Sequence, residues 1–241
     1  WKIKDGYLVL AKCEMPYRLK RLNGVDLSTA TNCCIQRTAS GKFYAIFTIS
    51  YVPDRTHGQG VVGVDLGLKT YAVVSDGSSH IAPKPFAACS KQLAHQQRLL
   101  SRKKKGSNRY EQQRLKVAKL HTKVKNIRLN FLHNVSARLV HDNQVVCLER
   151  LQVKNMVRNR HLARSLNDVG LGSLRYLVAY KMREANGALL LADPFFPSTQ
   201  LCSSCGARPD RKIQLGVSAW MCESCGTYHD RDENASQNLK Q

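Results

Sequence analysis

The sequence predicts an α/β protein in which helices flank a mixed β-sheet and a small metal-bound unit is inserted near the end of the chain. Three observations support this fold class. Short β-like runs occupy the first 80 residues, apolar residues at spacings of three and four follow residue 90, and two Cys-x-x-Cys pairs lie close to the end. A chain of 241 residues with 43% hydrophobic content can bury one large core plus smaller appendages.

The first segment, residues 1–60, contains several short β-like runs. The clearest covers residues 42–52, where apolar side chains alternate with less apolar ones after the turn-forming pair Ser40-Gly41. We therefore expect this segment to form part of a small sheet or a partial β-barrel.

A second β block starts after the break at Gly58-Gln59-Gly60. Residues 61–64 form an apolar run that leads into Asp65, and residues 70–74 form another run that ends at Ser75-Asp76-Gly77. Two runs joined by a short connection predict a hairpin with an acid on its first strand.

Residues 90–141 show a helical pattern that Gly106-Ser107-Asn108 interrupts, so we expect two helices here. Glu111 is the only acid in this segment. An ordinary solvated helix face is the alternative reading, but such faces usually mix both signs of charge. We expect this segment to contact the phosphates of a nucleic acid. The candidate contact residues are Arg102, Lys103, Lys104, Lys105, Arg109, Arg114, Lys123 and Arg128.

The remaining elements follow in order. A short strand at residues 145–148 ends at Glu149. Beyond a polar, basic stretch, we expect Ser173 to cap a helix that leads to a strand at residues 188–191. A last helix is expected to start near Asp232.

The charge balance indicates a polyanionic partner. The formal net charge is +21, from 38 Lys and Arg against 17 Asp and Glu, and nucleic acid is the leading candidate. An anionic membrane is the alternative, but the sequence has no apolar run of about 18 residues. We therefore expect no membrane partner. We also expect no small-molecule cofactor.

The cysteines predict a structural zinc site. Sixteen residues separate the pair Cys202 and Cys205 from the pair Cys222 and Cys225, and a glycine follows each pair. Such paired spacing suits one tetrahedral Zn²⁺ ion with four thiolates and no open position. The total of nine cysteines is odd, so metal binding in a reducing, intracellular compartment is favoured over a disulfide framework.

Three acids stand where acids are unusual. Asp65 interrupts an apolar strand, Glu149 ends another, and Asp232 lies at a helix start. Each acid also has an ordinary structural explanation on its own. Asp65 could be a turn residue, Glu149 a surface acid at a strand end, and Asp232 a charge favoured by the helix dipole. Together they suit the hydrolysis of a phosphodiester, for which carboxylates hold two divalent ions such as Mg²⁺ about 4 Å apart. We expect the three to converge at one edge of the sheet.

Four motifs, in this order, resemble those of the transposon-encoded TnpB nucleases, which are related to Fanzor and the type V CRISPR effectors. The resemblance runs from about residue 40 to the end. The family usually has more sequence in front, comprising a longer wedge region and a helical recognition domain, and often has Asp or Asn where Arg150 stands. The RuvC-I, RuvC-II, zinc-ribbon and RuvC-III motifs correspond to Val64-Asp65-Leu66-Gly67, Leu148-Glu149-Arg150-Leu151, Pro197-Ser198-Thr199 with the following Cys-x-x-Cys-Gly, and His229-Asp230-Arg231-Asp232-x-Asn234-Ala235.

The resemblance implies an RNA-guided DNA endonuclease of a transposable element with an RNase H-like (RuvC) fold. Guide RNA and target DNA would be its partners, and Asp65, Glu149 and Asp232 would bind the catalytic Mg²⁺. The implied parts are a partial wedge-like β-barrel at residues 1–60, a RuvC-like core at 61–196 that includes the basic helical segment 90–141, a zinc ribbon at 197–228 and the last RuvC helix at 229–241.

Two other functions remain open at this point. One is a structure-specific resolvase of the same fold that acts without a guide. The other is a nucleic-acid-binding regulator that descends from the nuclease and no longer cleaves. A regulator would usually have lost at least one of the three acids, and all three are present.

Overall fold

The computed structural model describes residues 1–20, 25–214 and 216–241. Four residues of the expected barrel segment and one of the expected ribbon therefore lie outside the described residues. The chain forms two compact units. The first unit comprises residues 1–52 and 93–122, and the second comprises residues 53–92 and 123–241.

Two small antiparallel sheets belong to the first unit. One has the order β1-β2-β3, with strands at Lys2–Lys4, Tyr7–Val9 and Tyr17–Arg18. The other pairs β4, Asn32–Arg37, with β5, Phe43–Thr48. The strand predicted at residues 42–52 is thus present as β5 but ends at Thr48, where its pairing with β4 ends.

A five-stranded mixed sheet forms the centre of the second unit, as predicted. Its order is β10-β9-β6-β7-β8, in which β10, β9 and β6 are parallel and β7 and β8 are antiparallel to their neighbours. The expected hairpin is present as β6 and β7, and Asp65 pairs with Val73. The strand bounds are Gly60–Leu66 for β6, Ala72–Val74 for β7, Ser79–His80 for β8, Asn143–Leu148 for β9 and Ala188–Leu191 for β10.

The predicted pair of long helices is present, as α1, Pro85–Ser101, and α2, Asn108–Asp142. The chain turns between them at Gly106, whose φ is 82°. No loop separates α2 from β9, because the helix ends at Asp142 and the strand begins at Asn143. The Asn143 side chain closes the junction by donating a hydrogen bond from Nδ2 to the carbonyl oxygen of Leu139, at 2.9 Å.

The region between β9 and β10 is more helical than predicted. It contains α3, Val153–Met156, α4, Arg160–Val169, and α5, Leu171–Glu184. The prediction that Ser173 caps a helix is wrong. Gly170, with a left-handed φ of 70°, both ends α4 and precedes α5, so the helix starts two residues before Ser173.

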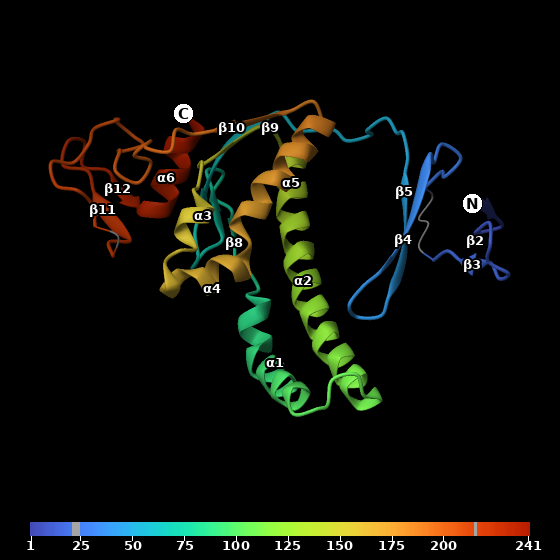
Figure 1. Cartoon of the computed structure of the whole chain (residues 1–241). Helices are drawn as coiled ribbons and strands as arrows, with labels where there is room; N and C mark the ends of the chain where they lie inside the picture. The colour runs from blue at the N-terminus through green and yellow to red at the C-terminus, as the bar shows by residue number, and fades with distance from the viewer. Residues whose placement is uncertain (21–24, 215) are drawn as a thin grey trace. The chain divides into compact units, whose positions relative to one another are not determined.

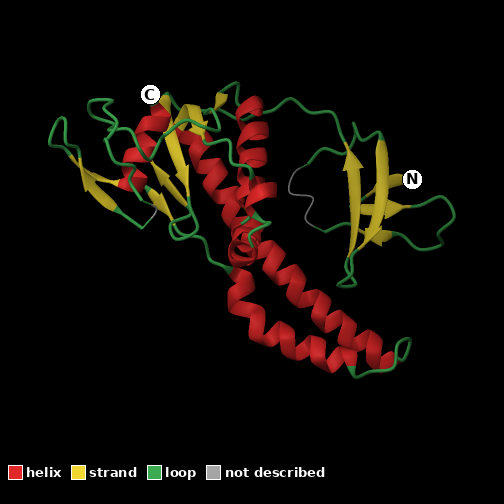
Figure 2. Cartoon of the chain, turned by 60° about the vertical axis from the view of Figure 1, so that its left-hand side comes forward, coloured by secondary structure: helices red, strands yellow, loops and turns green. Residues whose placement is uncertain are grey.

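The core of the second unit lies between the sheet and helices α2 and α5. Both views place α6, Arg231–Lys240, on the other side of the strands (Figures 1 and 2). Buried apolar side chains of the strands, α2 and α5 belong to one cluster, which includes Val62, Val64, Leu132, Val135, Leu139, Val178 and Met182. Burial of this apolar surface stabilises the sheet that carries Asp65.

Helix α6 packs directly onto β6 at Gly63. A Cβ atom at this position would lie 2.1 Å from the carbonyl oxygen of Ser236 and 2.5 Å from the amide nitrogen of Lys240. Only glycine allows the two backbones to approach so closely. This contact places α6 against the strand that carries Asp65.

The last two strands, β11 at Ala219–Met221 and β12 at Tyr228–Asp230, form an antiparallel pair just before α6. Among the helices described, none is both long and apolar enough to cross a bilayer.

Candidate functional site

The structure brings the three predicted acids to one end of the central sheet. Asp65 and Glu149 each lie one residue beyond Val64 and Leu148, which pair across the parallel strands β6 and β9. Both side chains are therefore at the carboxyl ends of adjacent strands. Asp232 is in the first turn of α6, the helix that packs on β6.

The charges of this group act on one another. The pKa of Asp65 is raised to about 7, first by burial and then by the negative charges of Glu149 and Asp232, while Arg231 opposes the shift. A carboxylate that resists ionisation because it is buried and lies near other carboxylates would be stabilised by a bound cation. The donor set therefore fits a hard divalent ion such as Mg²⁺.

The three carboxylates are more widely spaced than the cysteines. Within the described ranges, the cysteine group alone brings three or more ligand atoms within 4.8 Å of one another. A two-ion site tolerates wider spacing, because two ions about 4 Å apart, each about 2.1 Å from its ligands, reach oxygens up to about 8 Å apart. A pair of ions therefore places a weaker demand on ligand spacing than one tightly caged ion does.

Two neighbouring side chains hold the acids. The buried Ser198 hydroxyl donates a hydrogen bond to Glu149 Oε1, at 2.9 Å. The Arg231 guanidinium donates to Asp232 Oδ1 from both Nε, at 3.4 Å, and Nη2, at 3.3 Å. Each acid of the pair Glu149 and Asp232 therefore has a defined partner on the protein.

Helix α6 is tied to the segment that carries Ser198 through two asparagines one turn apart. Asn238 Nδ2 donates to the carbonyl oxygens of Ser198, at 2.7 Å, and Leu201, at 2.8 Å. Asn234 Nδ2 donates to the Leu201 carbonyl at 2.7 Å, and its Oδ1 accepts from the Ser203 amide at 2.9 Å. Both asparagines are buried, and the bond from Asn238 to the Ser198 carbonyl is fully buried.

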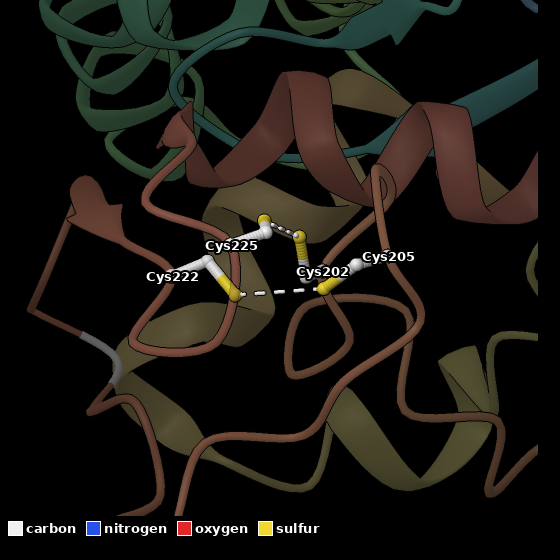
Figure 3. A group of neighbouring side chains, drawn as sticks. All are labelled: Cys202, Cys205, Cys222 and Cys225. Atoms are coloured by element: carbon white, nitrogen blue, oxygen red, sulfur yellow. Dashed lines mark hydrogen bonds between the residues drawn. The ribbon is translucent and has the colours of Figure 1, made fainter.

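The four predicted zinc ligands point toward one another (Figure 3). The sulfur atoms of Cys202 and Cys225 are 3.6 Å apart, and those of Cys205 and Cys222 are 3.7 Å apart. These distances greatly exceed the ~2.05 Å of a disulfide. They match the separation of about 3.8 Å expected between thiolates that surround one Zn²⁺ ion tetrahedrally at about 2.3 Å. The cysteine group thus fits the predicted closed metal site.

Both cysteine loops have the same backbone form. The amide of Gly206 donates to the Cys202 carbonyl, and that of Gly226 donates to the Cys222 carbonyl, each at 2.8 Å. The two glycines have left-handed φ values of 74° and 71°, which disfavour other residues. The buried His229 lies beside this site, with Nε2 3.0 Å from the sulfur of Cys202.

The predicted phosphate-contact residues lie in the turn between α1 and α2 and along α2. Most are exposed, but two are already engaged within the protein. Arg114 Nε pairs with Glu111 at 2.7 Å, and Arg128 Nη1 donates to the carbonyl of Asn167 near the end of α4. The residues from Arg102 to Lys105 lie in the turn.

Sequence reasoning assigned no role to four side chains of this region, although the first three stand within the quoted motifs: Ser198, Arg231, Asn234 and Asn238. The asparagines carry a recognisable signal, because residues four apart on a helix share one face. Ser198 carries none, since its partner Glu149 is 49 residues away in the chain.

Two family models match the chain. The model OrfB_IS605, described as "Probable transposase", matches residues 43–160. The model "Cas12f1-like, TNB domain" matches residues 172–239. Together they include all three acids and all four cysteines of the site.

Curated relatives agree with these matches. A "Putative RNA-guided DNA endonuclease" of Streptomyces pristinaespiralis is 35% identical over 98% of this chain and 59% of its own length. The "Putative RNA-guided DNA endonuclease InsQ" of Escherichia coli K12 is 32% identical over 83% of this chain and 53% of its own length. The chain therefore spans somewhat more than half of these relatives.

Similarity to solved structures supports the fold. The cryo-EM structure of a CRISPR-Cas12f ternary complex superposes with a TM-score of 0.55 and 18% identity, over 83% of this chain and 42% of that chain. The mixed α/β fold of this chain thus resembles that of Cas12f. A "TnpB-like protein L79" of Acanthamoeba polyphaga mimivirus is 32% identical over 58% of this chain and 26% of its own length. With the family matches and the relatives above, the chain belongs to the OrfB_IS605 family.

Proposed function

We propose that the chain forms the nuclease part of an RNA-guided DNA endonuclease of a transposable element. The observation that carries this proposal is the convergence of Asp65, Glu149 and Asp232, where burial and then the charges of the other two acids raise the pKa of Asp65 to about 7. The names of the curated relatives support the same activity. In this proposal the mixed sheet with its helices is an RNase H-like (RuvC) core at residues 61–196 and 229–241.

The three acids would hold divalent cations, and Mg²⁺ suits a set made only of carboxylates. Bound there, paired ions would activate a water molecule and stabilise the leaving oxygen of a phosphodiester. The chain contributes orientation, because Ser198 and Arg231 restrict the Glu149 and Asp232 side chains. Cys202, Cys205, Cys222 and Cys225 would hold a structural Zn²⁺ within a ribbon at residues 197–228.

Guide RNA and target DNA are the proposed partners. The net charge of +21 favours contact with phosphates, and the turn from Arg102 to Lys105 presents four consecutive basic residues. Residues 1–60, proposed as a partial wedge-like barrel, would add further contacts. Sequence choice would come from pairing with the guide, while the protein reads the backbone and a short flanking motif.

Replacing a candidate metal ligand tests the chemistry directly. Asp65→Ala and Asp232→Ala should each reduce Mg²⁺-dependent cleavage of DNA to background, because the ions lose a ligand, while nucleic-acid binding persists. Cleavage of a labelled duplex and its binding would be measured in parallel. Asp76→Ala, at an exposed acid of the same unit, serves as the control and should cleave normally. Cleavage at the wild-type rate by Asp65→Ala would reject the assignment.

The guide is tested by the RNA that accompanies the purified protein. One discrete bound RNA, required for cleavage of a matching target, is the expected result. Cleavage of branched DNA without bound RNA would instead indicate a structure-specific nuclease. Tight binding without cleavage under any condition would indicate a regulator.

A further inference from the structure

We propose that Ser198, held by Asn234 and Asn238, is a positioning residue through which the cysteine loop and α6 jointly orient Glu149. This inference rests on the proposed function, in which Glu149 is a metal ligand. It goes further by assigning a role to three side chains outside the acid triad. We name the three residues the clasp.

The first step is the contact between Ser198 and Glu149. Glu149 directly follows β9 and has three rotatable side-chain bonds, so the strand fixes its backbone but not its carboxylate. The hydroxyl of Ser198, a residue only 4% exposed, donates to Oε1 at 2.9 Å. One oxygen is thereby held, and Oε2 is left in a defined direction for a cation. Hydrogen-bonded partners of this kind commonly orient metal-binding carboxylates.

The second step is the support of Ser198 itself. Its carbonyl oxygen accepts from Asn238 Nδ2 at 2.7 Å, and the Leu201 carbonyl accepts from the same nitrogen at 2.8 Å. Asn234 Nδ2 donates a second bond to the Leu201 carbonyl, at 2.7 Å. The segment therefore cannot shift along α6 without breaking several buried hydrogen bonds.

The third step links this segment to the cysteine site. Asn234 Oδ1 accepts from the amide of Ser203, which lies between Cys202 and Cys205 in the first cysteine loop. Helix α6 is thus hydrogen-bonded both to the Ser198 segment and to the first cysteine loop, which would bind the proposed zinc. An ordered cysteine loop would hold Ser198 in place, and a disordered one would release it.

The clasp also connects two of the three acids. Asp232 stands on α6 itself, two residues before Asn234, and Glu149 reaches α6 through Ser198 and Asn238. A single helix therefore sets the spacing between an acid of its own and an acid on a neighbouring strand. A merely structural role for Ser198 would stabilise the fold but would leave cation affinity unchanged.

The test measures binding of Mn²⁺ alone, as a probe for Mg²⁺, by isothermal titration calorimetry on the zinc-loaded chain. Ser198→Ala should weaken Mn²⁺ binding about tenfold, in the range typical for loss of a hydrogen bond to a metal ligand, and Ser198→Thr should restore it. Zinc content and melting temperature are recorded for every variant. Ser204→Ala, at an exposed serine of the same cysteine loop, is the matched control and should bind like the wild type.

Disrupting the support tests the remaining link. Asn238→Leu keeps a similar volume but removes both donated bonds, so it should weaken Mn²⁺ binding at least as much as Ser198→Ala. Wild-type Mn²⁺ affinity in folded, zinc-loaded Ser198→Ala would overturn the inference, even if its melting temperature falls. If Asn238→Leu does not fold, the Mn²⁺ affinity of Ser198→Ala alone tests the positioning role.

Glu149→Ala separates this inference from the proposed function. If Glu149→Ala weakens Mn²⁺ binding but Ser198→Ala does not, the clasp is wrong and the metal site stands. If the wild type binds no Mn²⁺, or Glu149→Ala binds it normally, the proposed metal site fails and the clasp with it.

Discussion

At the scale of single residues, Asp65 makes a large contribution to the dependence of stability on pH. Its folded pKa of about 7 lies above the ordinary value of 3.8, so the folded state binds more protons than the unfolded state between these values. Without Mg²⁺, stability should therefore fall as pH rises from about 4 to about 7. Asp65→Asn should remove this loss. At pH 8 we expect it to stabilise the metal-free protein by about 2 kcal/mol, roughly half of the full shift at about 1.36 kcal/mol per pKa unit, because neighbours relax.

Urea unfolding of the zinc-loaded wild type and Asp65→Asn, from pH 5 to 8, measures the difference. Asp76→Asn is the control, because the contribution of Asp76 to stability should change with pH in the opposite direction. Although burial opposes it, hydrogen bonds from Ser78 lower the pKa of Asp76, so the stability that this acid contributes is lost as pH falls. If the free energy of unfolding depends equally on pH in the wild type and in Asp65→Asn, the pKa of Asp65 is not raised in the folded state.

Residue types and local spacing identified the acids and the cysteines as candidate ligands, and the structure brings the four cysteine sulfurs together. Cys202, Cys205, Cys222 and Cys225 were identifiable because both loops need the same short spacing and a glycine. Asp65 was identifiable because an acid in an apolar strand requires a partner. The contact of Ser198 was not, because its partner Glu149 is 49 residues away in the chain. Arg231 contacts the neighbouring Asp232, but the spacing of residues does not show which way its guanidinium turns.

At the scale of elements, the contact of α6 with β6 depends on Gly63. Gly63→Ala should destabilise the protein by about 3 kcal/mol, because its Cβ would overlap backbone atoms that cannot rotate away. It should also reduce cleavage, since α6 carries Asp232. Thermal unfolding and the cleavage assay would measure both effects.

Gly172→Ala is the matched control for this substitution. Its Cβ would meet only Val153 Cγ2, at 3.9 Å, so the change should be neutral or slightly stabilising in helix α5. Comparable stability of the two variants would mean that α6 can move away from β6 without penalty.

Long periodic elements were predicted well, and short polar ones were not. The two long helices and the β6–β7 hairpin follow from apolar periodicity and turn residues. Helix α4 was missed because its residues are mostly polar, although it buries Leu166 and Val169. The start of α5 was placed too late, because Gly170 turns the chain from α4 into α5 with almost no loop.

At the scale of the whole molecule, charge should govern nucleic-acid affinity. Changing Arg102, Lys103, Lys104 and Lys105 together to glutamine should weaken binding and make the slope of log affinity against log salt shallower by about 3. Fluorescence anisotropy with a labelled oligonucleotide from 50 to 300 mM salt would measure this slope.

The control removes four exposed basic residues from another part of the chain, at Lys154, Arg158, Arg160 and Arg175. Equal loss of slope in both variants would mean that phosphates are contacted diffusely, with no preference for the turn. A net charge of +21 allowed the class of partner to be predicted from composition. It did not indicate which cations are engaged internally, as Arg128 is.

The direct junction of α2 with β9 has a consequence for how this chain can vary. An extra residue in a loop is absorbed by the loop, but between Asp142 and Asn143 there is no loop to absorb it. One inserted residue would rotate the helix by about 100° or move every β9 side chain to the opposite face of the sheet. Gly58 packs so closely against the Asp142 carbonyl that a Cβ there would lie 2.2 Å from its oxygen. The pairing of β6 with β9 already shifts register at this joint, between Gly60 and Val61, so one irregular position is part of the existing arrangement. Insertions and deletions should therefore be excluded at this joint, while Glu149, six residues further on, keeps its register with Asp65.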